Sequence, residues 1–198
     1  MFSKFGMEKI LNDIQNSYEK KQVNELVNVS VKTKFLFELM AQLKKEGHRV
    51  LVFSMSKQML DLIELMIGND ETYKKDFTYQ RIDGDTEIAS REQMCKTFNA
   101  DESLFCCLLT TKVGGFGLNL TGADRAIILD PDWNPANDNQ AVDRCYRIGQ
   151  KKNVVVYRLV SIGGLEEKIY RRQVYKKGMN LQTLETENNE DGFDEKAL

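Results

Sequence analysis

Four polar side chains, Gln140, Asp143, Arg144 and Arg147, are spaced three or four residues apart. On an α-helix this spacing would place them on one face. Two arginines are costly in an apolar core but suit a surface that meets an anion. A guanidinium offers a planar fork of donors to phosphate oxygens and stays charged at every relevant pH. A solvated helix face with an Asp143–Arg147 ion pair is the alternative, and the spacing alone favours neither.

A second candidate for anion binding is the glycine-rich segment 110–120, Thr-Thr-Lys-Val-Gly-Gly-Phe-Gly-Leu-Asn-Leu. Such a segment after a strand can contact phosphates through backbone amides, or can form a dinucleotide site. The dinucleotide interpretation fails on spacing, because Leu120 stands where a small residue is needed and no helical pattern follows. Asp83 and Asp85 could suggest a magnesium site, but their place around Gly84 favours a turn.

Short apolar runs alternate with amphipathic patterns along the chain, and these elements must position the polar segments. Strands are predicted at 49–54, 78–82, 104–110, 125–130 and 154–161, and helices at 33–46, from Ser56, at 90–99 and from Asn134-Pro135. In the first of these helices, Phe35, Leu39 and Leu43 form the predicted buried stripe, with Leu36 and Met40 beside it. The alternation predicts an α/β fold with a parallel sheet covered by helices on both faces. Ligands bind such sheets at the carboxyl ends of the strands, which directs attention to segments 54–57, 83–86, 110–119 and 130–135.

Composition indicates one globular domain with terminal extensions, since 41% of the 198 residues are apolar. No apolar run approaches the roughly 20 residues that cross a bilayer, and the first residues have no signal-peptide centre, so we expect an intracellular protein without a membrane partner. The four cysteines and single histidine lack metal-ligand spacing, and we expect buried, reduced thiols and no metal site. The net charge of -2 neither requires nor excludes nucleic acid, because basic stretches near 144–152 and 168–177 precede an acidic end.

Taken in order, the motifs resemble the second RecA-like lobe of Swi/Snf-family ATPases, a branch of the superfamily-two helicase-like proteins. Residues 140–150, ending in Arg-Ile-Gly-Gln, are similar to motif VI, 110–120 to motif V, and 50–54 to motif IV. Asp-Pro-Asp-Trp-Asn-Pro at 130–135 is the segment that precedes motif VI in this family. The resemblance covers about residues 32–177, and segments 88–91 and 157–174 look most like the Cockayne syndrome B-like repair translocases.

The resemblance implies one lobe of a double-stranded-DNA-stimulated ATPase or translocase that acts in DNA repair or chromatin remodelling, in the nucleus if the organism is a eukaryote. It implies the following roles: arginine fingers toward ATP for Arg144 and Arg147, their orientation for Gln140, nucleotide contacts for Gly115, Gly117 and Asp143, and DNA backbone contacts for Ser54, Thr110, Thr111, Lys112 and Trp133. The family usually has Arg-Ala where Lys112-Val113 stand, and lysine keeps the charge without the fork. For Trp133, a packing role in its loop is the favoured alternative.

The sequence contains neither a Gly-x-x-x-x-Gly-Lys-Ser/Thr loop nor an acidic Walker B pair. We therefore expect that the chain alone does not hydrolyse ATP, and that ATP with Mg²⁺ is held mainly by a first RecA-like lobe of the same, longer protein. Double-stranded DNA, and possible nucleosomes, are the implied partners. The expected organisation is an N-terminal helical extension at 1–29, the RecA-like lobe at 30–163, a brace-like basic helix at 164–178 and a disordered acidic tail at 179–198. A non-catalytic binding module and a strand-separating helicase are the competing classes.

Overall fold

Five parallel strands form one sheet in the computed structural model, which describes residues 30–114, 117–147 and 149–176. The strand order is β2-β3-β1-β4-β5, and every neighbouring pair is parallel. The strands are β1 (Val50–Ser54), β2 (Tyr79–Ile82), β3 (Cys106–Thr110), β4 (Arg125–Ile128) and β5 (Val155–Arg158). All five predicted strands are present, and each is one to four residues shorter than predicted.

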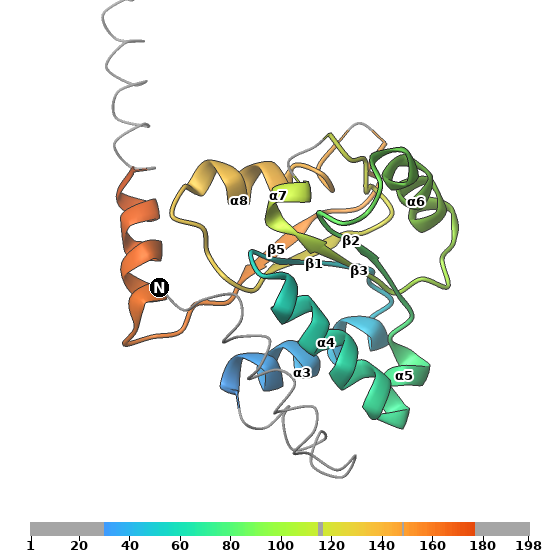
Figure 1. Ribbon diagram of the computed structural model, residues 1–198, viewed down its shortest axis with the longest axis horizontal. Helices are drawn as coiled ribbons and strands as arrows, with labels where there is room; N and C mark the ends of the chain where they lie inside the picture. Colours follow the sequence, from blue (N-terminus) through green and yellow to red (C-terminus); the bar gives the residue numbers. More distant parts are fainter. Residues whose placement is uncertain (1–29, 115–116, 148, 177–198) are drawn as a thin grey trace, which may run out of the picture.

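Helices cover both faces of this sheet and make a three-layer α/β fold (Figure 1). The helices are α3 (Val31–Lys45), α4 (Lys57–Asn69), α5 (Glu71–Asp76), α6 (Ile88–Ala100), α7 (Thr111–Gly114) and α8 (Pro135–Val142), and residues 165–176 form a further helix near the C-terminus. Helices α3, α4 and α5 lie on one face, and α6, α7 and α8 on the other (Figure 1). No helix of the described residues is long and apolar enough to cross a membrane.

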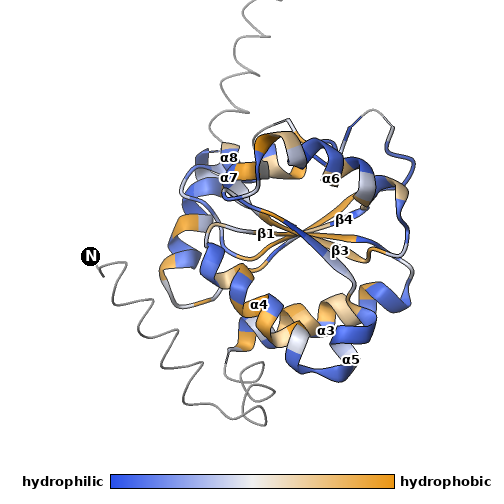
Figure 2. Cartoon of the chain, turned by 45° about the vertical axis from the view of Figure 1, so that its right-hand side comes forward, coloured by the Kyte–Doolittle hydropathy of each residue, from blue (hydrophilic) through white to orange (hydrophobic). Residues whose placement is uncertain are grey.

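The strands carry side chains into two separate apolar cores, one on each face of the sheet. Every residue of β1 and β3 is buried, as expected for central strands covered on both sides. Along β1 the side chains alternate, because Val52 belongs to the core under α3 and α4, whereas Phe53 belongs to the core under α6 and α8. Figure 2 shows the apolar sides of the helices turned toward the sheet.

Helix boundaries follow local signals where a capping side chain is present. Ser56 accepts a hydrogen bond from the Met59 amide at the start of α4, and Asn134 caps α8 with Pro135 in its first turn, as predicted. The stripe predicted for α3 is partly wrong: Phe37 is fully buried and Phe35 is half exposed. Helices α5 and α7 were not predicted, since six and four residues are too short to give a periodic pattern.

Segments 1–29 and 179–198, for which we predicted a helical extension and an acidic tail, lie outside the described residues. The helix at 165–176 occupies the segment predicted as a brace-like helix. It stands beside the sheet rather than in the two helical layers (Figure 1).

Candidate functional site

The carboxyl edge of the sheet brings the ends of β1 and β3 together, because Ser54 pairs in register with Thr110. Ser54 is fully buried, and its hydroxyl donates to Asp130 Oδ2 at 3.2 Å. The Met55 amide donates to the same oxygen at 2.6 Å. Burial raises the pKa of Asp130 although both hydrogen bonds act to lower it. The Ser54 hydroxyl therefore holds the start of the 130–135 loop, and a direct contact to DNA by this hydroxyl stays a prediction.

Motif V leaves β3 and forms the single turn of α7. Thr110 and Thr111 are both buried, while Lys112 is exposed. In the described part of the chain, the buried Thr111 hydroxyl has no hydrogen-bond partner, which is unusual for an enclosed polar group. Gly115, predicted to contact the nucleotide, lies outside the described residues. Among the predicted phosphate contacts of this loop, Lys112 is the side chain presented to solvent.

Motif VI is not one continuous helix, so the expectation of a single shared face was wrong. Helix α8 ends at Val142, and Asp143 is its C-terminal cap. The chain then turns, and the Arg144 carbonyl accepts a hydrogen bond from the Leu120 amide of motif V at 3.1 Å. In a helix that continued past Arg144, this carbonyl would accept from an amide of the helix itself, so motif V satisfies it instead. Of the four polar side chains predicted to share a face, Gln140 is the one that lies on α8, and it is exposed.

The two arginines differ in environment as a result of this turn. Arg144 is only 4% exposed, and burial together with the charge of Arg147 lowers its pKa, against a raising effect of Asp143. Arg147 is exposed, and its Nη1 donates to the Gly117 carbonyl at 3.1 Å. Gly117 has a φ of 75°, which favours glycine. The alternative Asp143–Arg147 ion pair is not among the ion pairs of the described residues, so Arg147 is oriented by motif V.

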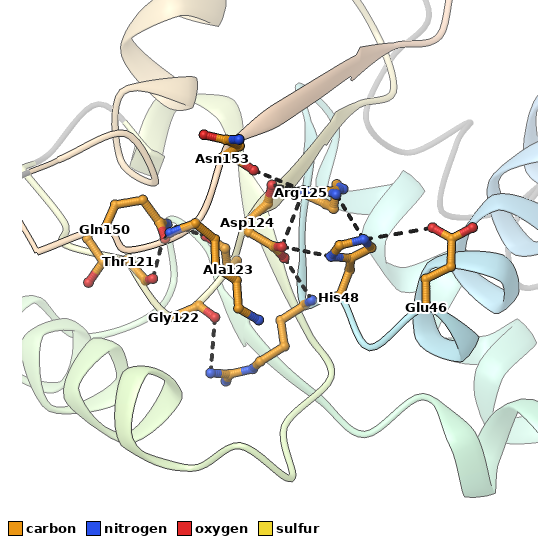
Figure 3. A network of polar contacts seen from close by, with 11 residues as sticks. Glu46, His48, Thr121, Gly122, Ala123, Asp124, Arg125, Gln150 and Asn153 are labelled. Atoms are coloured by element: carbon orange, nitrogen blue, oxygen red, sulfur yellow. Dashed lines mark hydrogen bonds and ion pairs between the residues drawn. The ribbon is translucent and has the colours of Figure 1, made fainter.

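Gln150, at the end of motif VI, is a site residue that the sequence analysis did not single out. Its Nε2 donates to the carbonyls of Thr121, Ala123 and Cys145 at 3.2, 2.8 and 3.1 Å. Its Oε1 accepts from the Lys152 amide at 2.9 Å. Figure 3 shows this side chain directed at the segment that precedes β4. The end of the arginine-bearing turn is thus tied to the amino edge of the sheet.

A second polar network joins the amino ends of three strands (Figure 3). His48 Nδ1 lies 2.7 Å from Asp124 Oδ2, and Arg125 Nη2 lies 2.8 Å from His48 Nε2. Because Arg125 can only donate, Nε2 accepts, and Nδ1 carries the proton given to Asp124. Arg125 also donates to the Asn153 carbonyl at 3.0 Å. A pocket of about 500 Å³ beside this network lies at the edge opposite Ser54 and Thr110, so we assign the network to the fold.

Trp133 is 54% exposed and sits in the loop between β4 and α8. The Asn134 amide donates to Asp132 Oδ1 at 2.8 Å, and the Asp132 amide lies 3.3 Å from both carboxylate oxygens of Asp138. Gln173, from the helix at 165–176, reaches the same loop and donates to Asp138 Oδ2 at 3.0 Å. The loop is therefore fixed by polar contacts while the indole stays largely accessible.

The remaining candidates shape the fold. Asp83 Oδ1 accepts from the Asp85 amide at 2.9 Å, and Asp83 Oδ2 lies 2.7 Å from Arg81 Nη2, as expected of a turn-forming carboxylate. Among the described residues no group of three or more His, Cys, Asp or Glu side chains could hold a metal ion. All four cysteines are free and buried, as predicted, and burial raises the pKa of Cys106 to about 12 and that of Cys145 to about 11.

Comparison with known proteins agrees with this arrangement. The family described as helicase conserved C-terminal domain matches residues 31–149. The chain is 50% identical over 159 residues to DNA excision repair protein ERCC-6-like of zebrafish (Danio rerio), and the matched residues make up 80% of this chain and 11% of the relative. It is 51% identical over 140 residues to human DNA excision repair protein ERCC-6 (71% of this chain, 9% of the relative). It is also 51% identical over 147 residues to Protein CHROMATIN REMODELING 8 of Arabidopsis thaliana (74% and 12%).

The fold agrees as well. The crystal structure of the C-terminal part of the Fun30 ATPase domain matches with a TM-score of 0.70 and 30% identity, over 86% of this chain and 54% of that one. The predicted RecA-like architecture is thereby confirmed. The chain spans between 9% and 12% of the length of the three curated relatives named above.

Proposed function

We propose that this chain, which belongs to the helicase conserved C-terminal domain family and to its Swi/Snf branch, is one half of a DNA-stimulated ATPase that translocates on duplex DNA. The observation that carries the proposal is the junction of motifs V and VI. Arg147 is exposed and oriented by the Gly117 carbonyl, and Arg144, earlier in the same turn, is buried. A solvent-facing guanidinium held by a backbone carbonyl is suited to meet an anion delivered from outside the lobe.

The proposed role of Arg144 and Arg147 is to stabilise the phosphates of ATP as arginine fingers. Charge spreads over the transferred phosphoryl group in the transition state, and a cation placed there accelerates hydrolysis by roughly 10³ to 10⁵. Arg147 would make the direct contact, because Arg144 is enclosed. Gln140 and Asp143, both exposed at the end of α8, would complete the polar surface, and Gly115 and Gly117 would bring backbone toward the nucleotide.

The proposed substrate and partners rest on the sequence and on the names of the relatives. ATP with Mg²⁺ would be bound by a first RecA-like lobe of the same protein, since the sequence has no P-loop or Walker B pair. The described residues offer exposed cations rather than a cluster of metal ligands. Because its sequence has no P-loop, we expect the chain alone not to turn over ATP. The names of the relatives, which refer to excision repair and chromatin remodelling, support a nuclear protein acting on DNA and, within chromatin, on nucleosomes.

The proposed DNA contacts are sequence-independent and salt-sensitive, because they are made to the phosphate backbone. Lys112 and Trp133 are the exposed members of the predicted set. Ser54, Thr110 and Thr111 would contribute through the shape of the edge and its backbone amides, since their side chains are enclosed. If Trp133→Ala leaves both the fold and the DNA affinity unchanged, Trp133 is neither a DNA contact nor a packing anchor.

The test is ATP turnover, with and without duplex DNA, in a longer protein that joins this chain to a first lobe carrying the P-loop. We expect DNA-stimulated turnover that falls by roughly 10³ in Arg147→Ala. The matched control is Lys96→Ala, which removes an exposed cation of α6 that pairs with Glu92; it should retain full turnover. Absence of turnover in the unmodified protein would overturn the enzyme proposal and favour a binding module that kept the fold.

A further inference from the structure

The helix at 165–176 is linked to the segment that follows β4 at both ends, through Lys32 near its start and directly through Gln173 near its end. Near its start, the Glu166 carboxylate accepts from the Ser161 amide at 2.9 Å and from Lys32 Nζ at 2.5 Å. Lys32 Nζ also donates to the Leu129 carbonyl at 2.7 Å. Between the two ends, Ile169 is buried. The helix therefore packs on the fold through a defined face rather than projecting freely.

The second attachment is a single buried amide. Gln173 is only 5% exposed, and its Nε2 donates both to Asp138 Oδ2, at 3.0 Å, and to the Asp132 carbonyl. Asp138, in the first turn of α8, is almost fully enclosed and also receives the Asp132 amide. One side chain of the C-terminal helix thus contacts both sides of the loop that presents Trp133.

We propose that Gln173 is a positioning residue that couples the C-terminal helix to the Trp133 loop and to the start of α8. A buried carboxylate needs donors, and Gln173 supplies one from an element that lies outside the two helical layers (Figure 1). A displacement of the helix would remove this donor and release the loop between β4 and α8. Its consequence for DNA rests on the proposed function, in which Trp133 faces the duplex.

The test uses the 198-residue chain, in which Trp133 is the single tryptophan and so reports directly on the loop. In Gln173→Met, which keeps the length of the side chain and removes both hydrogen bonds, we expect acrylamide quenching of Trp133 to rise, by at most about twofold because the indole is already 54% exposed. Hydrogen exchange of the Asp132 amide should accelerate roughly tenfold, since its acceptor Asp138 loses its other donor.

Arg171→Met is the matched control, because Arg171 lies on the same helix, is exposed and pairs with Glu167. It should leave both signals unchanged. If Gln173→Met fails to fold by far-UV circular dichroism, Glu166→Gln replaces it, since it weakens the other attachment of the helix and should shift both signals in the same direction. Unchanged quenching and exchange in a folded variant would overturn the coupling.

A readout of DNA action separates coupling from simple destabilisation. In the two-lobe protein, which joins this chain to a first lobe carrying the P-loop, Gln173→Met should raise several-fold the DNA concentration needed for half-maximal stimulation of ATP turnover. Turnover without DNA should stay the same. An equal fall in both turnover rates, with normal DNA dependence, would indicate a merely structural role and contradict the proposal. A shift in Trp133 quenching without any DNA-stimulated turnover in the unmodified protein would retain the coupling and reject the proposed function.

Discussion

Replacement of Gln150 by methionine tests how the arginine-bearing turn is held. The Gln150 side chain donates to three carbonyls and accepts from the Lys152 amide, and all four distances are 3.2 Å or less. Each such bond contributes about 0.5 to 1.5 kcal/mol net. The Nε2 has only two hydrogens for three acceptors. The side chain also borders a pocket of about 500 Å³, from which water can replace part of the lost hydrogen bonding. We therefore expect a destabilisation of about 2 kcal/mol.

The assay is urea unfolding of Gln150→Met followed by far-UV circular dichroism, with a thermal scan that should show a fall in Tm of about 6 °C for a domain of this size. The control is Gln93→Met, an exposed glutamine on α6, which should change the free energy of unfolding by less than about 0.5 kcal/mol. If the two variants have the same stability, the Gln150 contacts contribute nothing measurable and the reasoning is refuted.

Three further predictions concern the fold around the site. Gly122→Ala should destabilise the chain by about 1 to 3 kcal/mol in urea unfolding, because the added Cβ would lie 2.9 Å from Asn99 Cα. Gly68→Ala is the control: it lies at an open position in α4 and should stabilise the chain by up to about 1 kcal/mol. Equal effects would contradict steric crowding at Gly122. Burial raises the folded-state pKa of Asp130, so the stability due to its protonated form is present below the unfolded pKa and is lost as pH rises through the folded pKa. The unfolding free energy of Asp130→Asn relative to the unmodified chain should thus increase from about pH 4 toward pH 7, and a flat difference would reject this shift. Arg81→Met should destabilise by about 2 kcal/mol at pH 7, since Arg81 binds Asp61, Glu64 and Asp83. Burial acts to raise the pKa of Asp83, but Arg81 helps to hold this pKa below its ordinary value. This stability is therefore present above the unfolded pKa, and the loss should shrink as pH falls through the folded pKa; a loss that does not depend on pH would speak against the Arg81–Asp83 ion pair.

The strands could be predicted from the sequence because their signal is local. An uninterrupted apolar run such as 50–54 is typical of a strand covered on both faces, and β1 is buried throughout. The caps Ser56 and Asn134 are also local signals, and both act as predicted. The identity of the buried face of α3 depended on how the helix meets the sheet, which spacing does not specify, so Phe37 replaced Phe35 in the core.

The candidate site was predictable in its residue types but not in its contacts. Helix α8 ends at Val142, and beyond its end the Arg144 carbonyl accepts from the Leu120 amide, 24 positions earlier in the chain. The bonds of Gln150 to the segment before β4 and of Gln173 to Asp138 likewise join distant parts of the chain. The hydrophobic periodicity of a sequence contains no information on contacts between such distant residues. The enclosure of Ser54 and Thr111 was missed for the same reason, since exposure is decided by neighbours from other elements.

The most direct test of the central proposal separates nucleotide binding from nucleotide cleavage in the two-lobe protein carrying Arg147→Ala, with duplex DNA at saturation. A cation that acts on the transition state predicts that the single-turnover cleavage rate falls by roughly 10³, while the affinity for ATP changes by less than about tenfold. An unchanged cleavage rate, with or without weaker ATP binding, would contradict the account and leave Arg147 as a contact of motif V alone.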